Sequence, residues 1–258
     1  MKKFLLAACF ISALLLNAEE IFSPKRSADW DGRPALTNEG IFQKKQSSRL
    51  ISMKSFDVSP DCEYTLSGEF RLVNSTKSKP FFFGFIPRLA NGTRIEQKHF
   101  RQRVNTTLGE VTEDAKANSR EIKIKNAKNY PVSMPGIFAA FNAKADNSDL
   151  PNFDIIPIKN IKSENNNATI TLQVPLKKDI KKGTLIRLQC LGADFVYVGS
   201  SGKILSDQWK TFSGKIKFDG NGHRWFPGTQ KANIVMLGGT ADGIVEFRNI
   251  KVSAEKIK

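Results

Sequence analysis

Two tryptophans with polar neighbours are the residues of this 258-residue chain best suited to hold a ligand. Trp225 lies in the turn-rich segment 221–228, so we expect its indole to project from a loop and stack on a ring-shaped ligand. Beside it, His223 and Arg224 can bond hydroxyl, carboxylate or sulfate groups. Trp209 is in phase with the polar side of the strand that follows it. The alternatives are a Trp225 ring folded back onto the core and a Trp209 ring at the core edge.

A basic cluster is the second candidate for ligand binding. Lys98, Arg101 and Arg103 lie close together in a chain whose net charge is +15, and such an excess attracts anions. We therefore expect the cluster to bind a polyanion, whereas the lysines at 177–182 are more typical of a solvated turn. The sequence contains no recognition-helix, zinc-finger or RNP-like pattern, so nucleic acid is not an expected ligand.

The sequence contains few candidate catalytic residues. His99 and His223 are the two histidines, which excludes a His-rich metal site and leaves two bases for a Ser-His-Asp triad. Residues 199–202 do not form a Gly-x-Ser-x-Gly nucleophile elbow and instead indicate a hairpin turn. We assign no catalytic residue.

Two enzymatic alternatives stay open. Glu110, Glu113 and Asp114 could supply the paired carboxylates of a glycoside hydrolase, but they lie in a polar stretch typical of a solvated loop. A polyanion lyase could combine the basic cluster with His99 and a tyrosine, although no tyrosine can be placed near them.

The elements that must position these side chains are β-strands. Apolar and polar residues alternate with period two, and Gly, Asn and Asp separate the alternating segments. In the last strand the apolar phase slips by one residue at Arg248–Asn249, which predicts a β-bulge. Segment 81–86 is apolar on both faces and is expected to be central in a sheet. The predicted strands are 63–72, 81–86, 170–174, 185–191, 211–218, 232–237 and 244–252.

Many short strands without helical periodicity predict an all-β fold, an antiparallel β-sandwich of jelly-roll type. We expect an extended lead-in at 19–37 and one sandwich domain over 38–258. The sequence pattern shows the strands of residues 105–167 poorly, and we expect this region to form either an insertion or a second sheet.

The N-terminus has the features of a secretory signal peptide over residues 1–18, with Lys2 and Lys3 before an apolar stretch and cleavage after Ala18. Removing 18 of 258 residues and two of the positive charges leaves 240 residues with a net charge of +13. No later apolar run approaches the ~20 residues of a membrane span, so we expect a secreted or periplasmic protein.

Cys62 and Cys190 are the cysteines beyond the signal peptide. An oxidising compartment permits a disulfide between them, and two separately buried thiols are the alternative.

Four segments resemble the galactose-binding-like jelly rolls, which include carbohydrate-binding modules of secreted bacterial glycosidases. They are Leu-Thr-Asn-Glu-Gly-Ile-Phe at 36–42, Val-Ser-Pro-Asp-Cys-Glu-Tyr-Thr-Leu-Ser-Gly at 58–68, Trp-Lys-Thr-Phe-Ser-Gly at 209–214 and Gly-Ile-Val-Glu-Phe-Arg-Asn-Ile-Lys-Val at 243–252. The resemblance implies a jelly-roll fold, a polysaccharide or glycan ligand and a glycosidase as partner.

One departure from that family concerns calcium. Its closing strand often carries an Asp that binds a structural calcium ion, and here Arg248–Asn249 stands in that place. A guanidinium repels the cation, so no metal or other cofactor is expected, although Glu39, Asp242 and Glu246 could still donate oxygen atoms.

Together these patterns predict a secreted, non-catalytic carbohydrate-binding protein that recognises acidic or sulfated glycans. A polysaccharide lyase or glycoside hydrolase, and a structural envelope or adhesion protein, are the alternatives.

Overall fold

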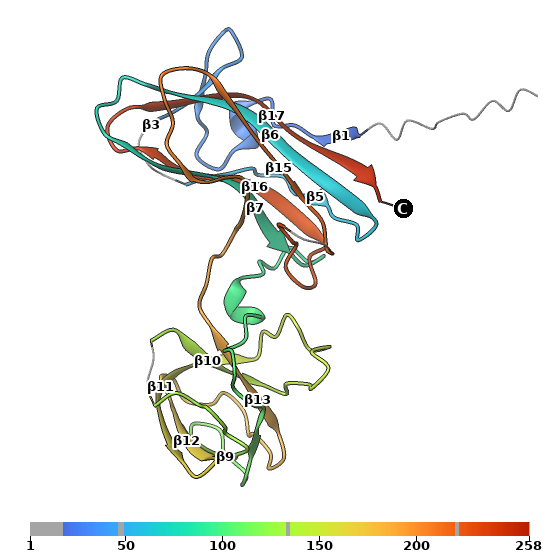
Figure 1. Ribbon diagram of the computed structural model, residues 1–258, viewed down its shortest axis with the longest axis vertical. Coiled ribbons are helices and arrows are strands. Elements are labelled where there is room, and N and C mark those ends of the chain that lie inside the picture. Colours follow the sequence, from blue (N-terminus) through green and yellow to red (C-terminus); the bar gives the residue numbers. More distant parts are fainter. Residues whose placement is uncertain (1–17, 46–48, 133–134, 220–221, 258) are drawn as a thin grey trace, which may run out of the picture.

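The computed structural model describes residues 18–45, 49–132, 135–219 and 222–257. The predicted signal peptide therefore lies outside the described residues, except for Ala18. The structure is all-β, as predicted, and its sheets are antiparallel. Figure 1 shows two stacked sheets with a separate barrel beneath them. In the described part of the chain no helix is long and apolar enough to cross a membrane.

The two stacked sheets form a sandwich around one core. The first sheet has the order β15 (Lys210–Ile216), β6 (Cys62–Val73), β17 (Ile244–Lys256), β3 (Phe42–Lys45) and β2 (Ala35–Leu36), with β1 (Glu19–Phe22) also paired to β17. The second has the order β14 (Val196–Lys203), β7 (Ser78–Arg88), β16 (Lys231–Thr240) and β4 (Leu50–Ile51), with β5 (Phe56–Asp57) also paired to β16. The expected lead-in 19–37 thus supplies β1, the short 3-10 helix η1 (Ser27–Asp29) and β2.

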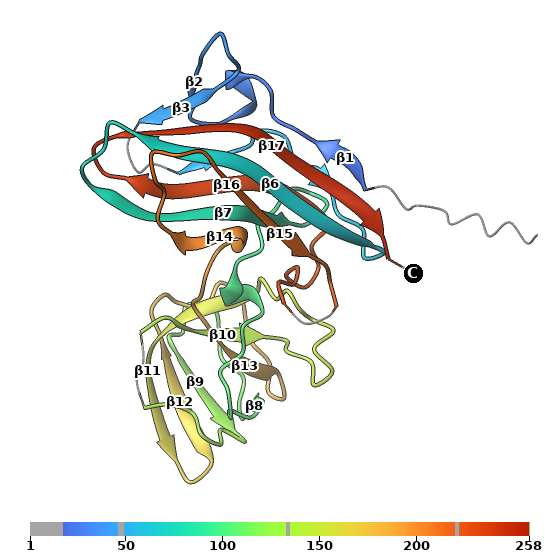
Figure 2. The same ribbon diagram turned by 45° about the horizontal axis from the view of Figure 1, so that its top comes forward.

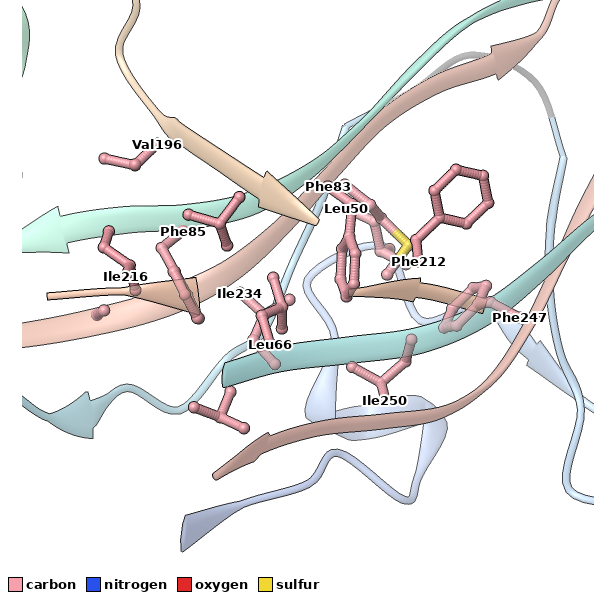
Figure 3. Packing of buried hydrophobic residues seen from close by; sticks show 14 of the residues in the cluster. Leu50, Leu66, Phe83, Phe85, Val196, Phe212, Ile216, Ile234, Phe247 and Ile250 are labelled. Atoms are coloured by element: carbon pink, nitrogen blue, oxygen red, sulfur yellow. The ribbon is translucent and has the colours of Figure 1, made fainter. Parts of the chain in front are cut away.

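Strict alternation builds the sandwich core. Along β6 the even-numbered residues from Tyr64 to Leu72 point inward, and the odd-numbered residues face solvent. Phe81, Phe83 and Phe85 of β7 face them from the second sheet, and Figure 3 shows how such rings pack between the strands. As the sequence predicts for segment 81–86, β7 lies inside its sheet, between β14 and β16.

The predicted β-bulge in the closing strand is confirmed. The register between β17 and β6 shifts between Arg248 and Lys251, and Asn249 has a φ of 54°. Two consecutive side chains therefore face outward before Ile250 returns to the core. A Cβ atom at Gly68 would lie within contact of Ile250 Cδ1, so glycine at the opposing position leaves room for this side chain.

A closed six-stranded barrel occupies the chain between β7 and β14 (Figures 1 and 2). Its order is β10 (Ile137–Phe141), β11 (Ile155–Glu164), β12 (Asn167–Leu172), β9 (Glu121–Lys125), β8 (Gly109–Val111) and β13 (Leu185–Cys190), which pairs back to β10. The barrel has its own apolar cluster. It is larger than the expected insertion at 105–167, because the strands predicted at 170–174 and 185–191 belong to it.

The 3-10 helix η2 (Gln97–His99) lies between sandwich and barrel (Figure 2). The Phe100 ring lies 4.8 Å from that of Phe226 in the sandwich, and the His99 ring lies 4.3 Å from that of Phe153 beside the barrel. The Asn152 N–H donates to the His99 carbonyl at 2.7 Å. Adjacent residues of one short segment therefore contact both parts of the molecule.

Candidate functional site

Trp225 is not a surface platform, which corrects the first prediction from the sequence. Its side chain is 4% exposed and packs in the sandwich core, with ring centroids 5.0 Å from Phe85 and 5.7 Å from Tyr64. The backbone N–H of Trp225 donates to the carbonyl of Lys217 at 3.1 Å, which connects this loop to the residue after β15. The alternative, a ring folded back onto the core, is the one found. His223 and Arg224 are exposed beside it.

Trp209 lies on the outer face of the first sheet, where the phase of its strand placed it. Its ring is partly exposed and contacts two guanidinium groups, with the ring centroid 4.7 Å from Cζ of Arg71 and 4.3 Å from Cζ of Arg248. The two arginines come from the neighbouring strands β6 and β17. Cation–π contact therefore holds the indole against the sheet.

Acidic residues of the same face fix these arginines. Arg71 Nε donates to Glu246 Oε2 at 2.6 Å, and Arg248 Nε donates to Glu69 Oε2 at 2.8 Å. Asn249, the second outward residue of the bulge, donates to Glu69 Oε1 at 2.9 Å. These bonds, from Asn249 first and Arg248 second, lower the pKa of Glu69. Glu69 thus stays ionised and its negative charge is compensated.

A polar groove of about 570 Å³ runs over the outer face of β15, β6 and β17. Glu69 connects it to Arg248, one of the two arginines that hold Trp209, and Thr211 is the next outward residue after Trp209 along the strand. Ser23 Oγ donates to the Ile250 carbonyl at 2.9 Å, which fastens the N-terminal wall to β17. The lining residues are Glu20, Ser23, Lys25, Ser67, Gly68, Glu69, Thr211, Ser213, Asn249 and Lys251.

This lining combines hydrogen-bond donors and acceptors without an apolar side chain. Hydroxyl groups can donate and accept, the Asn249 amide does both, Lys25 and Lys251 donate, and carboxylates accept. The partly exposed indole of Trp209 lies outside this lining, two residues before Thr211 on the same face of the sheet. Such a surface suits a ligand that carries many hydroxyl groups.

The predicted basic cluster lies elsewhere, at the start of the inserted region. Lys98 pairs with Glu96 at 2.5 Å, and Arg101 donates to the Leu191 carbonyl at 3.0 Å. Arg103 is partly exposed. Two of the three charges already have partners within the protein, and the cluster does not line the polar groove.

The two cysteines are not bonded, so the disulfide that an oxidising compartment would permit is not found. Cys62 begins β6 in the sandwich and Cys190 ends β13 in the barrel, and both thiols are free. The alternative of two separate thiols is the one found, although both are partly buried rather than fully buried.

His99 is packed rather than presented to a cleft. Its side chain is 7% exposed, and Nδ1 accepts the N–H of Glu96 at 3.0 Å. Burial, reinforced by Lys98, lowers the pKa of His99, so the ring is neutral at pH 7. A nitrogen engaged in this way is not free to act as a general base.

Among the described residues, no cluster of three or more His, Cys, Asp or Glu side chains is arranged to hold a metal ion. Glu246, one of the oxygen donors considered for calcium, is bonded to Arg71 and Gln43. The expectation about calcium stays a prediction.

Comparisons of the chain with protein-family models, with curated proteins and with solved structures find no match. The resemblance to galactose-binding-like domains therefore stays a prediction. The site has to be interpreted from its own chemistry.

Proposed function

We propose that this protein is an exported, non-catalytic glycan-binding protein with a jelly-roll sandwich, and that the polar groove is its binding site. The observation that carries the proposal is the partly exposed Trp209, held by two arginines on the same sheet face as a groove lined by polar side chains. A pyranose ring offers C–H groups to the indole face and hydroxyl groups to the polar lining.

The charges of the groove favour an acidic or sulfated glycan. Lys25 and Lys251 face the groove, while the negative charge of Glu69 is compensated by Arg248. Glu20 is the other carboxylate of the lining. The net positive charge of the whole chain raises the local concentration of such a ligand. A glycosidase that acts on the same polymer is the partner we propose.

The test is a glycan-array measurement on residues 19–258 at low and high salt, with Trp209→Ala as the principal variant. We expect this variant to weaken binding about tenfold or more, because an aromatic anchor supplies a large share of the binding energy at such sites. Thr211→Val removes one hydroxyl at nearly constant volume and should weaken binding by a smaller factor. Binding to acidic glycans should fall as salt rises.

The matched control is Tyr197→Ala. Tyr197 is also a partly exposed aromatic residue, but it lies on β14 of the opposite sheet. We expect its binding to be unchanged. Equal loss in both variants, or no glycan binding by the wild type, would overturn the proposal.

The same samples separate the alternatives. Release of shortened or unsaturated sugar products would identify a hydrolase or lyase. Absence of both binding and products would favour a structural envelope or adhesion protein.

A further inference from the structure

A lysine is buried on the short strand β3 of the sandwich. The alternation of inward and outward residues along this strand would place a core residue there. Phe42 and Lys44 share the inward face of β3, and Lys44 is 5% exposed. Gln43 and Lys45 alternate with them along the strand, and Gln43 is partly exposed and Lys45 exposed. Burying an ammonium group is costly, so such a lysine needs either a close partner or the neutral form.

The surroundings raise the proportion of the neutral form above that of an ordinary lysine. Asp31 is the acidic residue that acts on Lys44, and one of its carboxylate oxygens already accepts the N–H of Ile51 at 2.8 Å. Arg33 and Lys45, which also line the site, are positive. Burial lowers the pKa of Lys44 to about 8, and Asp31 opposes the shift. A substantial fraction of the amine is therefore unprotonated near neutral pH.

A cavity of about 270 Å³ gives this amine access to a small molecule. It lies between β3, β4 and the segment 32–35 that leads into β2. The volume admits a small molecule, whereas a polymer would not fit. The lining residues are Gly32, Arg33, Pro34, Ala35, Gln43, Lys44, Lys45 and Leu50.

We propose that the Lys44 amine is a nucleophilic site that captures a small aldehyde in this cavity as an imine. The nitrogen lone pair attacks the carbonyl carbon, and a C=N bond replaces the C=O bond. The carbonyl oxygen leaves as water with the two amine protons, so no oxidant or reductant is consumed. This site is independent of the glycan groove, which lies on the outer face of the sheet.

The chemistry of the site suits an aldehyde. An imine is uncharged, as is the amine that forms it, so the reaction places no charge in the buried position. Buried lysines with lowered pKa values are the ones that form Schiff bases in proteins.

The experiment is reductive alkylation of the folded protein with propionaldehyde and cyanoborohydride, mapped by peptide mass spectrometry. Lys45 is the matched control, because it is adjacent in sequence and exposed. At pH 7.5 we expect Lys44 to be labelled about tenfold faster, since its neutral fraction exceeds that of an ordinary lysine by about two orders of magnitude. The expected rate ratio is smaller than the ratio of neutral fractions because the cavity restricts access to Lys44.

Two further measurements distinguish selection by the cavity from a higher reactivity of the amine alone. Dextran aldehyde should label Lys45 and spare Lys44, because a polysaccharide chain is far larger than the cavity. In 8 M urea the two lysines should be labelled at equal rates. Labelling of Lys44 that is no faster than that of Lys45 in the folded protein, or equal labelling by both aldehydes, would overturn the proposal.

Discussion

The sandwich and the barrel are filled by different kinds of side chain. The sandwich core is rich in aromatic rings, with Phe70 in contact with the rings of Phe81, Phe83, Phe212 and Phe247 at centroid distances of 4.7–6.3 Å. The barrel core consists mainly of isoleucine, leucine and alanine. Two sheets about 10 Å apart leave a slab that rings can fill. The interior of a small closed barrel is narrower and takes branched aliphatic side chains.

The two parts also treat the outer faces of their strands differently. The outer face of β6 and β17 in the sandwich is open and carries the polar groove. In the barrel the outward residues Arg187 and Gln189 of β13 are buried, because the loop after β10 and the segment around His99 cover them. An open face leaves room for a ligand, whereas a covered face has to satisfy its polar groups within the protein.

The largest expected effect tests whether the two cores are separate. Phe70→Ala should lower the free energy of unfolding of the sandwich by about 4 kcal/mol, because it empties a fully buried ring position. Ile170→Ala, equally buried in the barrel, should cost about 3 kcal/mol. Urea unfolding followed by tryptophan fluorescence reports the sandwich, since Trp30, Trp209 and Trp225 all lie there.

Far-ultraviolet circular dichroism of the same samples reports both parts. We expect Ile170→Ala to shift part of this signal and leave the fluorescence transition in place. If both variants move the fluorescence transition equally, the sandwich and the barrel unfold as one cooperative unit and the comparison fails.

The next effect is confined to the barrel and tests its covered face. Arg187 donates to both carboxylate oxygens of Asp149 at 2.8 and 3.0 Å, and both side chains are less than 10% exposed. Asp149→Asn leaves the guanidinium buried without its counter-charge, which should cost about 3 kcal/mol of barrel stability. Asp146→Asn, in the same loop but exposed, is the control and should change little.

Asp149 also makes the stability of the barrel depend on pH in the acid range. Burial alone would raise the pKa of Asp149, but hydrogen bonds from Arg187, Asn152 and the Lys144 N–H lower it to about 2. Because the folded value lies below the unfolded value near 3.8, this contribution is complete above pH 4 and is lost as the pH falls towards 2. The Asp149→Asn variant should lack this loss. Wild-type and variant proteins with the same acid dependence would contradict it.

The contrast between the two parts also explains what the sequence could predict. Segments 63–72 and 211–218 alternate cleanly because each strand has one open face, and both were placed correctly. The phase slip at Arg248–Asn249 located the bulge. The barrel strands were harder to find. β8 has three residues, and buried polar residues such as Arg187 interrupt the pattern on β13.

The groove shows the same limit at a functional site. The outward phase of Trp209, Thr211 and Ser213 was visible in the sequence. The contribution of Ser23 and Lys25 was not, because pairing of β1 with β17 brings them to residues more than 200 positions away. Trp225 shows the opposite error, since a turn-rich sequence predicts a loop but does not determine whether a ring in that loop faces solvent or core.

The smallest expected effect lies at the junction, where His99 packs on Phe153. Its pKa is lowered by burial and by Lys98 and Arg94, against the opposing charges of Glu96 and Asp194. The unfolded chain therefore takes up a proton first as the pH falls below about 6.5, and stability decreases until the folded pKa is passed. We expect a small decrease in the free energy of unfolding between pH 7.5 and 5.5. His99→Gln should remove this dependence in urea titrations, and His223→Gln should retain it because His223 is exposed. A His99→Gln protein that keeps the full dependence would show that groups other than this ring make the junction sensitive to acid.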